Sequence, residues 1–586
     1  MKIVVLQRDI VWAQPAENCR RCSEAIVRNP GADLYVLPEM FSTGFCTNPE
    51  GIAETTDSDT LKWMKAVAAE KDAAIAGSVA VTDGEQIVYT NERGEYNIAS
   101  TKPYGLVYIT TPSGYKPAMK DSVRPNFWAK TVEAIDVKER HDFELKKVDD
   151  STFSVLMFSD THFCNDPKRN DVKHFKELVM PAINRAATDT PHSVFSVNLG
   201  DITWDRFWYA TGLSIESVPQ HLADNGFPMP FYCVNGNHDY DPSVPATDNP
   251  NVNAIKRFSD TFGPTFYSMN RGGVHFVMLD NIVYKNEIKE NQKTAKGVAG
   301  SRNYDLYVDE MQLAWLAKDL QSVDKTTPVV VCMHAPLFTY NVDGEQVSGF
   351  KDDKANALVE LVKEFESVRF FTGHSHRTMS FVHPEYPNIV EYNVTSVGGD
   401  LWTTPDKCGL NIGEDGADAG FYLCTFKNGK FSKRWYSVER GSEYPFRAYD
   451  MNEVAKVYKQ SKELQYLCKL QKNQVDYSSP KYKNYVYVNC WIWEDGCTLT
   501  ATENGKRLKV EKSADSDPLA AKVIFAKPNI FETTKESKKT NRLSRAANMF
   551  RFKTSSATAP VVITLTTPDG ESYTQTFNRP TPLPVE

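Results

Sequence analysis

The sequence of 586 residues lacks the features that mark membrane, nucleic-acid-binding and fibrous proteins. It has no run of about 18 apolar residues, which a membrane-spanning helix requires. It has no run of five or more Lys or Arg, and 67 basic against 75 acidic residues give a net charge of −8, so we expect neither a membrane nor a nucleic-acid polymer as a partner. Gly (31) and Pro (32) are scarce enough to exclude collagen and long low-complexity linkers.

The N-terminus and the cysteines carry no sign of export. The opening apolar run, IVVL, ends at Gln7 and is too short for a signal peptide. The eleven Cys residues are odd in number and scattered, which does not suit a disulfide framework. As written, the chain is therefore expected to be cytoplasmic.

Hydrophobic patterning predicts an α/β (α+β) multidomain protein. Residues 1–80 alternate short strands and helices, and they form the first domain. Strands are expected at 3–6, 33–37 and 73–81, and helices at 16–28 and 60–71. Residues 81–148 carry short strands separated by Gly-containing turns, and they predict a small β-sandwich domain. Its expected strand segments are 86–90, 91–98 and 105–115.

The second half of the chain divides in the same way. Residues 149–440 show a strand-then-helix rhythm on a larger scale, which predicts a central β-sandwich flanked by helices. Residues 441–586 begin with a charged helical connector at 447–475. They continue after residue 484 with alternating apolar and polar runs, which predict a second small β-sandwich.

Five strand-like runs between residues 153 and 376 each end in a cluster of polar residues. The clusters are Ser159-Asp160-Thr161-His162, Gly200-Asp201, Asn235-Gly236-Asn237-His238-Asp239, His334-Ala335-Pro336 and Thr372-Gly373-His374-Ser375-His376. Because ligands bind at the carboxyl ends of strands in α/β sheets, we expect these clusters to converge on one crevice. Glycines beside Asp201, Asn237 and His374 allow sharp turns there.

The residue types in these clusters indicate a metal site. Imidazole and carboxylate without thiolate suit divalent transition metals, so we expect two ions drawn from Mn, Fe and Zn. Asp201 can bridge both ions, because a carboxylate has two oxygens. Any one of these motifs alone is more often a structural turn than a ligand, but the ordered set after five strands is hard to obtain by chance.

The ordered set resembles the calcineurin-like metallophosphoesterase superfamily over about residues 150–440. The resemblance implies that Asp160, His162, Asp201 and His376 hold one metal, and that Asp201, Asn237, His334 and His374 hold the other. It also implies that His238 is a catalytic residue that faces the phosphate or the leaving group. Relatives often continue with G-D-x-x-D-R. Here Asp205-Arg206 is spaced one residue wider, so we assign no phosphate contact to Arg206.

The charges of such a site predict its chemistry. Two divalent ions offset the repulsion between an anionic ester and hydroxide, and they lower the pKa of a shared water. The bridging hydroxide then attacks phosphorus in line, and His238 either donates a proton to the leaving oxygen or binds the charge that develops there. The predicted function is hydrolysis of a phosphomonoester or phosphodiester. The expected partner is a phosphorylated small molecule, glycan or nucleotide, and the loops at 205–229, 281–305, 337–352 and 393–420 are expected to line its pocket.

The flanking segments carry two further resemblances. TNERGEYNI and VYITTPSGY before the central domain, and VYVNCWIWEDGCTLTATENGK after it, resemble the β domains of a bacterial metallophosphoesterase subfamily that is often exported. Residues 1–80, with DLYVLPEMFSTGF, resemble the start of a nitrilase of the omega-amidase type, in which Glu39 would be the general base. The Lys and Cys motifs of that family are missing and Cys46 is misplaced, so we interpret this segment as a truncated, inactive fragment. A natural fusion and a reading-frame artefact both account for it.

Two other functions compete with the phosphoesterase. One is a carbon–nitrogen hydrolase acting through Glu39, which the missing nucleophile opposes. The other is a binding or scaffold protein with a vestigial metal site. The intact set of eight positions opposes that hypothesis, because loss of function would not preserve all of them.

Overall fold

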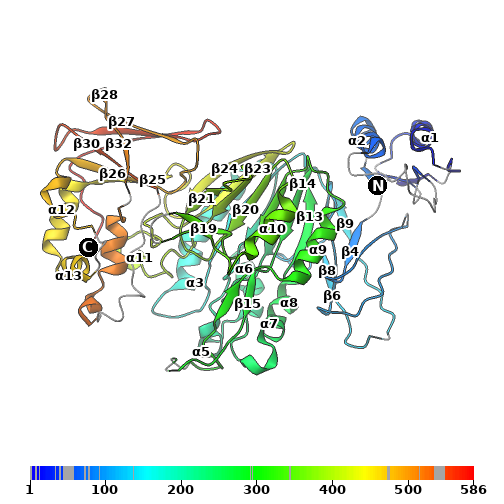
Figure 1. The fold of residues 1–586 in the computed structure, drawn as a ribbon, viewed down its shortest axis with the longest axis horizontal. Helices are drawn as coiled ribbons and strands as arrows, with labels where there is room; N and C mark the ends of the chain where they lie inside the picture. Colours follow the sequence, from blue (N-terminus) through cyan, green and yellow to red (C-terminus); the bar gives the residue numbers. More distant parts are fainter. Residues whose placement is uncertain are drawn as a thin grey trace.

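A computed structural model of the chain describes residues 3–6, 9–11, 13–32, 34–37, 41–43, 58–71, 74–76, 79–91, 93–135, 137–290, 292, 295–341, 345–470, 475–513, 515–532 and 548–585. The C-terminal domain and the N-terminal segments lie on opposite sides of a large central domain (Figure 1). The expected fold class is confirmed, since the centre consists of two sheets covered by helices. Among the residues described, no helix has the length and apolarity to cross a membrane.

The central domain contains a five-stranded and a six-stranded sheet. The first has the order β12-β11-β10-β23-β24, and the second has the order β13-β14-β17-β20-β22-β21. In the first sheet β10 pairs in parallel with β11, which pairs in parallel with β12, and in the second β17 lies parallel between β14 and β20. The strands are β10 (Thr152–Phe158), β11 (Ser193–Asn198), β12 (Phe231–Cys233), β13 (Tyr267–Arg271), β14 (Val274–Met278), β17 (Val329–Cys332), β20 (Val368–Thr372), β21 (Met379–Val382), β22 (Ile389–Asn393), β23 (Gly420–Lys427) and β24 (Lys430–Ser437).

The two sheets pack face to face, and helices cover their outer faces. Along β10, Val155 and Met157 contribute to the core that also holds Phe276 of the other sheet, whereas Leu156 and Phe158 belong to the outer core under the helices. Both faces of β10 are therefore buried, which explains its continuous apolar sequence. The main covering helices are α4 (Met180–Thr188) and α6 (Val218–Asp224) on the first sheet, and α9 (Glu310–Leu320) and α10 (Lys354–Val362) on the second.

The first segment forms a small sheet of its own. It has the order β1-β2-β3, all parallel, and consists of β1 (Ile3–Val5), β2 (Leu34–Val36) and β3 (Ala74–Ala76) with helices α1 (Pro15–Arg28) and α2 (Asp59–Lys71). The expectation of one strand over 73–81 is wrong. β3 belongs to this sheet, and β4 (Ala80–Thr82) belongs to the next. A continuous apolar run does not reveal where the chain changes sheets.

The next part is a small β domain that packs on one edge of the central domain. Its four-stranded sheet has the order β5-β4-β6-β8, with β5 (Ile87–Tyr89), β6 (Leu106–Ile109) and β8 (Trp128–Lys130), and β7 (Tyr115–Pro117) pairs with β9 (Leu145–Lys147). The segment expected as a strand at 91–98 contains none among its described residues. Asn270 of β13 donates to the carbonyl of Thr111, so this domain continues the hydrogen bonding at the β13 edge, which would otherwise be unpaired.

The C-terminal domain contains two four-stranded sheets, two longer helices and the short helix α14 (Pro518–Ala520). The sheets have the orders β25-β26-β30-β29 and β28-β27-β31-β32. The elements are β25 (Phe446–Asp450), α12 (Met451–Gln460), α13 (Lys462–Leu470), β26 (Tyr485–Cys490), β27 (Thr498–Glu503), β28 (Lys506–Arg507), β29 (Glu511–Ser513), β30 (Met549–Lys553), β31 (Val561–Thr566) and β32 (Ser572–Phe577). The stretch expected as a purely helical connector from residue 447 therefore begins as a strand.

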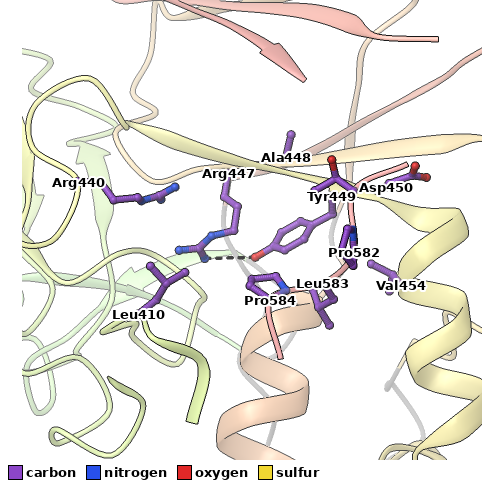
Figure 2. Close-up of a pocket in the computed structure, with 11 residues that line it drawn as sticks. Leu410, Arg440, Arg447, Ala448, Tyr449, Asp450, Val454, Pro582, Leu583 and Pro584 are labelled. Atoms are coloured by element: carbon purple, nitrogen blue, oxygen red, sulfur yellow. Dashed lines mark hydrogen bonds between the residues drawn. The ribbon is translucent and has the colours of Figure 1, made fainter. Parts of the chain in front are cut away.

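A buried ionic network joins this domain to the central one. Asp418 is fully buried, and its carboxylate accepts hydrogen bonds from Arg440 at 2.7 Å and from Arg447 of β25. Arg447 also donates to the carbonyl of Gly416 at 2.7 Å. Beside this network lies a cavity of about 270 Å³ (Figure 2). It is lined by Leu410, Arg440, Arg447, Ala448, Tyr449, Asp450, Val454 and residues 581–584. None of the candidate metal ligands lines it.

Candidate metal centre

The predicted ligands lie at the carboxyl ends of five strands, as expected, but these strands come from both sheets. Asp160 and His162 follow β10, Asp201 follows β11 and Asn237 follows β12 in the five-stranded sheet. His334 follows β17, and His374 and His376 follow β20 in the six-stranded sheet. The site therefore lies where the ends of the two packed sheets meet.

The backbone at this site is unusual. Five of the predicted ligands adopt the left-handed conformation, with φ of 55° at Asp160, 48° at His162, 49° at Asp201, 66° at His374 and 53° at His376. This conformation is uncommon for residues other than glycine, and such residues concentrate at functional sites. The clustering of these outliers on the candidate ligands is an independent indication of function.

Two glycines let the strand ends approach closely. A Cβ on Gly236 would lie 2.2 Å from the backbone nitrogen of Asp201, and a Cβ on Gly373 would lie 1.8 Å from Ser159 Oγ and 2.7 Å from Asp160 Oδ2. Neither space admits a side chain. The expectation that these glycines permit close packing of the clusters is confirmed.

One group of candidate ligands surrounds Asp160. His376 Nε2 lies 3.2 Å and His162 Nε2 lies 3.6 Å from Asp160 Oδ1, and the two imidazole nitrogens are 2.9 Å apart. Each of the three residues offers one ligand atom, and all three atoms lie within 4.8 Å of one another. Asp160 Oδ1 is buried and has no hydrogen-bond partner among the described residues, so it is available to a cation.

A second group surrounds His334. Its Nε2 lies 3.3 Å from Asp201 Oδ2, 3.2 Å from Asn237 Oδ1 and 3.1 Å from His374 Nδ1. Asp201 Oδ2 also lies 3.8 Å from His162 Nε2 of the first group. The Asp201 carboxylate therefore stands between the two groups, in the position that a bridging ligand would need.

The electrostatics of the site favour most of the protonation states that bind metal. Burial alone would raise the pKa of both carboxyl groups. The charge of His376 nevertheless holds the pKa of Asp160 well below its usual range, and the charges of His334 and His238 do the same for Asp201. Burial lowers the pKa of His162 to about 4 and that of His374 to about 3, so these imidazoles are neutral. His334 differs: despite its burial, Asp201 raises its pKa to about 9, so metal binding there would release a proton.

The side chains thus fit a pair of transition-metal ions. The donors are carboxylate and amide oxygens together with imidazole nitrogens, which is the set expected for Mn, Fe or Zn. The loop behind them is also fixed, because Thr378 donates its N–H to Asp415 at 2.9 Å and Arg377 pairs with Glu414 at 3.4 Å. His376 is therefore held between its strand and residues 414–418.

His238 lies beside the metal ligands but is held by a different partner. Its Nδ1 lies 2.8 Å from Asp205 Oδ1, and one of its ring nitrogens lies within 4.8 Å of ligand atoms of His162 and Asp201. Since Nδ1 is engaged by Asp205, Nε2 is the nitrogen left for a substrate. Burial lowers the pKa of His238, but the carboxylates of Asp201 and Asp205 outweigh burial and raise it, which favours the protonated ring.

Two polar residues next to His238 were not assigned a role from the sequence. Asp205 was noted only for its spacing, and Arg302 lies in a loop without a motif. Arg302 Nη1 lies 2.6 Å from Asp205 Oδ1. For Asp205 the neighbouring D-R motif was the available signal, whereas nothing local identifies Arg302. Glu39 and Cys46 of the first segment lie outside the described residues.

Comparison with protein families assigns most of the chain to one group. The model of the N terminal of calcineurin-like phosphoesterase matches residues 65–148, that of calcineurin-like phosphoesterase matches 153–378, and that of its C terminal matches 391–573. The model of carbon–nitrogen hydrolase matches residues 2–98.

Individual relatives match shorter stretches. Omega-amidase YafV of Escherichia coli is 38% identical over 81 residues, which are 14% of this chain and 31% of the amidase. Purple acid phosphatase 23 of Arabidopsis thaliana is 24% identical over 230 residues, 35% of this chain and 42% of the phosphatase. The chain thus spans less than half the length of either relative.

The solved structures that the chain resembles include two phosphatases. A dimetal phosphatase from Danio rerio is 14% identical with a TM-score of 0.30, and the match covers 48% of this chain and 98% of that one. Purple acid phosphatase PPD1 of yellow lupin is 12% identical with a TM-score of 0.34, covering 63% and 74%. Because the N-terminal, central and C-terminal models of one family match successive stretches from residue 65 to residue 573, the chain belongs to the calcineurin-like phosphoesterases, and its residues 2–98 also match the model of carbon–nitrogen hydrolase.

Proposed function

We propose that this protein hydrolyses a phosphate ester at two divalent transition-metal ions. One ion would be held by Asp160, His162, Asp201 and His376, and the other by Asp201, Asn237, His334 and His374. The observation that carries the proposal is the place of Asp201 Oδ2, which lies 3.8 Å from a nitrogen of the first group and 3.3 Å from a nitrogen of the second. A shared carboxylate oxygen between two groups of donors is the arrangement that a two-metal phosphoesterase requires.

The metal ions, when bound, would supply positive charge to the phosphoryl oxygens and a water of lowered pKa. The protein supplies the rest. Asp205 fixes the His238 ring through Nδ1, which leaves the opposite nitrogen free to protonate the leaving oxygen. The His238 side chain is 23% exposed, whereas Asp205 is fully buried, so a substrate can reach the imidazole while its partner stays shielded from water.

We further propose the domain division 1–80, 81–148, 149–440 and 441–586. The separate sheets β1-β2-β3 and β5-β4-β6-β8 support the first boundary. The first segment contributes nothing to catalysis in this proposal, because the match to omega-amidases covers 31% of their length and no nucleophile motif follows Glu39. The metal site and the substrate pocket belong to residues 149–440 alone.

Turnover and metal content test the proposal together. Protein purified without chelator should contain about two transition-metal ions per chain and should hydrolyse p-nitrophenyl phosphate or bis-p-nitrophenyl phosphate. Chelation should abolish this turnover, and Mn²⁺ should restore it. Protein that binds no transition metal after reconstitution would contradict the metal assignment. Two bound metals without turnover of either ester, or of a wider panel of phosphoesters, would favour the scaffold alternative.

A further inference from the structure

Arg302 occupies a backbone position that is strained and firmly held. It lies just before β16 (Tyr304–Leu306), which pairs with β15 (Ile282–Tyr284) in a hairpin. Its φ is 56°, and its N–H donates to Asn286 Oδ1 at 3.0 Å. Asn286 is itself buried and donates to the carbonyls of Pro242 and Val244. A left-handed conformation outside glycine persists where the surroundings enforce it, often at functional sites.

The fixed backbone directs the Arg302 side chain to the catalytic edge of the metal centre. Nη1 lies 2.6 Å from Asp205 Oδ1 and 3.3 Å from His238 Nδ1. Two residues further on, the Tyr304 ring packs edge-on against His374, with centroids 5.8 Å apart. The hairpin therefore presents both residues to the candidate centre, Arg302 beside His238 and Tyr304 beside His374.

The guanidinium has donors to spare. Nη1 is occupied by Asp205, but Nε and Nη2 make no hydrogen bond with any residue that the structure describes. The side chain is 20% exposed. Because a guanidinium offers five N–H groups in a planar fork that matches phosphate oxygens, the unused donors form an anion-binding edge next to His238.

We propose that Arg302 binds a non-bridging oxygen of the substrate phosphate and thereby selects phosphomonoesters over phosphodiesters. This inference rests on the proposed two-metal function. A phosphodiester has two non-bridging oxygens, and two metal ions would occupy both. A phosphomonoester has a third, which leaves one oxygen for a further donor. An additional guanidinium beside the leaving-group histidine is therefore useful for a monoester and has no anionic oxygen to bind in a diester.

Arg206 provides a matched control within the same chain. The D-R motif would have suggested Arg206 for a phosphate contact, and this residue directly follows Asp205. Its side chain makes no hydrogen bond or ion pair with the part of the chain that the structure describes, although its backbone N–H donates to Asp205. Arg302, 97 residues away from Asp205 in sequence, makes the contact instead. The two arginines thus carry the same charge. Arg206 is next to Asp205 in the sequence, whereas Arg302 contacts Asp205 in space.

The test compares Arg302→Ala, Arg302→Lys and Arg206→Ala with the wild type, each with its metal content measured. We expect the wild type to prefer p-nitrophenyl phosphate over bis-p-nitrophenyl phosphate in kcat/KM. Arg302→Ala should lose about 10- to 150-fold on the monoester, the range for a hydrogen bond to a charged group, and a smaller factor on the diester, where only its contact with Asp205 is lost. Arg302→Lys should recover part of the loss, since it keeps the charge without the fork. Arg206→Ala should stay within about twofold on both esters.

Isothermal titration of the metal-loaded proteins with inorganic phosphate gives a readout that does not depend on turnover. Arg302→Ala should weaken phosphate binding at least about tenfold, and Arg206→Ala should not. Equal losses on both esters, a wild-type preference for the diester, or unchanged phosphate affinity in Arg302→Ala would overturn the inference. If the wild type hydrolysed neither ester, the proposed function would fail, and the titration would still decide whether Arg302 binds phosphate.

Discussion

Replacing His238 with Ala separates proton donation from metal binding. His238 directly follows the candidate ligand Asn237, but its Nδ1 is hydrogen-bonded to Asp205 at 2.8 Å, so we assign its other nitrogen to the substrate. General acid catalysis is worth about 10²–10⁴ in rate. Because the His238 side chain is 23% exposed, water can enter the vacated space and act as a poor substitute donor.

The size of the effect should depend on the leaving group. Nitrophenolate leaves readily without a proton, so His238→Ala should lower kcat on p-nitrophenyl phosphate by about 10². An alkyl phosphate needs the proton, so the loss there should approach about 10⁴. The assay is steady-state turnover of both substrates, with metal content measured on the same samples, and about two ions per chain should remain.

His334→Ala serves as the contrasting variant, because its Nε2 contacts three other candidate ligands and its removal should release metal. If His238→Ala lost metal together with activity, His238 would be a ligand. If it slowed both substrates by the same factor, a role in phosphate binding would replace that of the general acid.

Three further predictions concern other parts of the chain. Asp201→Asn removes the charge shared by both groups of ligands, so it should lower metal content and turnover more than His376→Ala does; near-normal values in Asp201→Asn would refute the bridging assignment. Glu39→Gln should leave phosphoesterase turnover unchanged, and the wild type should release no ammonia from omega-amides; steady amidase turnover that Glu39→Gln abolishes would reveal a second active site. Burial and the charge of Asp418 raise the pKa of Glu439 to about 8, so the folded state keeps a proton that the unfolded state releases above about pH 4.5. The stability that protonated Glu439 gives the wild type should therefore fall as the pH rises from about 5 to 8. The melting temperature of Glu439→Gln should fall less over that interval. Parallel profiles of melting temperature against pH in the two proteins would count against the raised pKa.

The strand pattern in the sequence predicted the clusters that contain the candidate ligands, and the resemblance to the phosphoesterases singled out the ligands within those clusters. A short apolar run that ends in Asp, Asn or His places its polar residue at the edge of a sheet, and the structure brings all seven such positions together. The assignment of those strands to two sheets could not be predicted. Local periodicity predicts a strand but not the strand with which it pairs. The sequences of β10 and β17 therefore do not indicate that these strands belong to different sheets.

The errors have a common physical cause. The run at 73–81 is apolar apart from Gly77 and Ser78, yet its two ends belong to different sheets. A charged helical connector was expected from residue 447, yet the Arg447 side chain is buried against Asp418 from a distant part of the chain. Arg302 reaches Asp205 across 97 residues. In each case a long-range contact determines the structure, and the local sequence does not indicate that contact.

The ionic network around Asp418 affects which domains of this protein can be separated from one another in evolution. Residues 414–418 contact Arg377 and Thr378, which follow His376, on one side and accept Arg447 of the C-terminal domain on the other. Removal of Arg447 would leave a buried carboxylate undercompensated, a change that typically costs 3–5 kcal/mol. The central and C-terminal domains are therefore expected to pass through evolution as one unit. The first segment differs, because its sheet ends at Ala76 before the next begins at Ala80, so it can be gained or lost as a block.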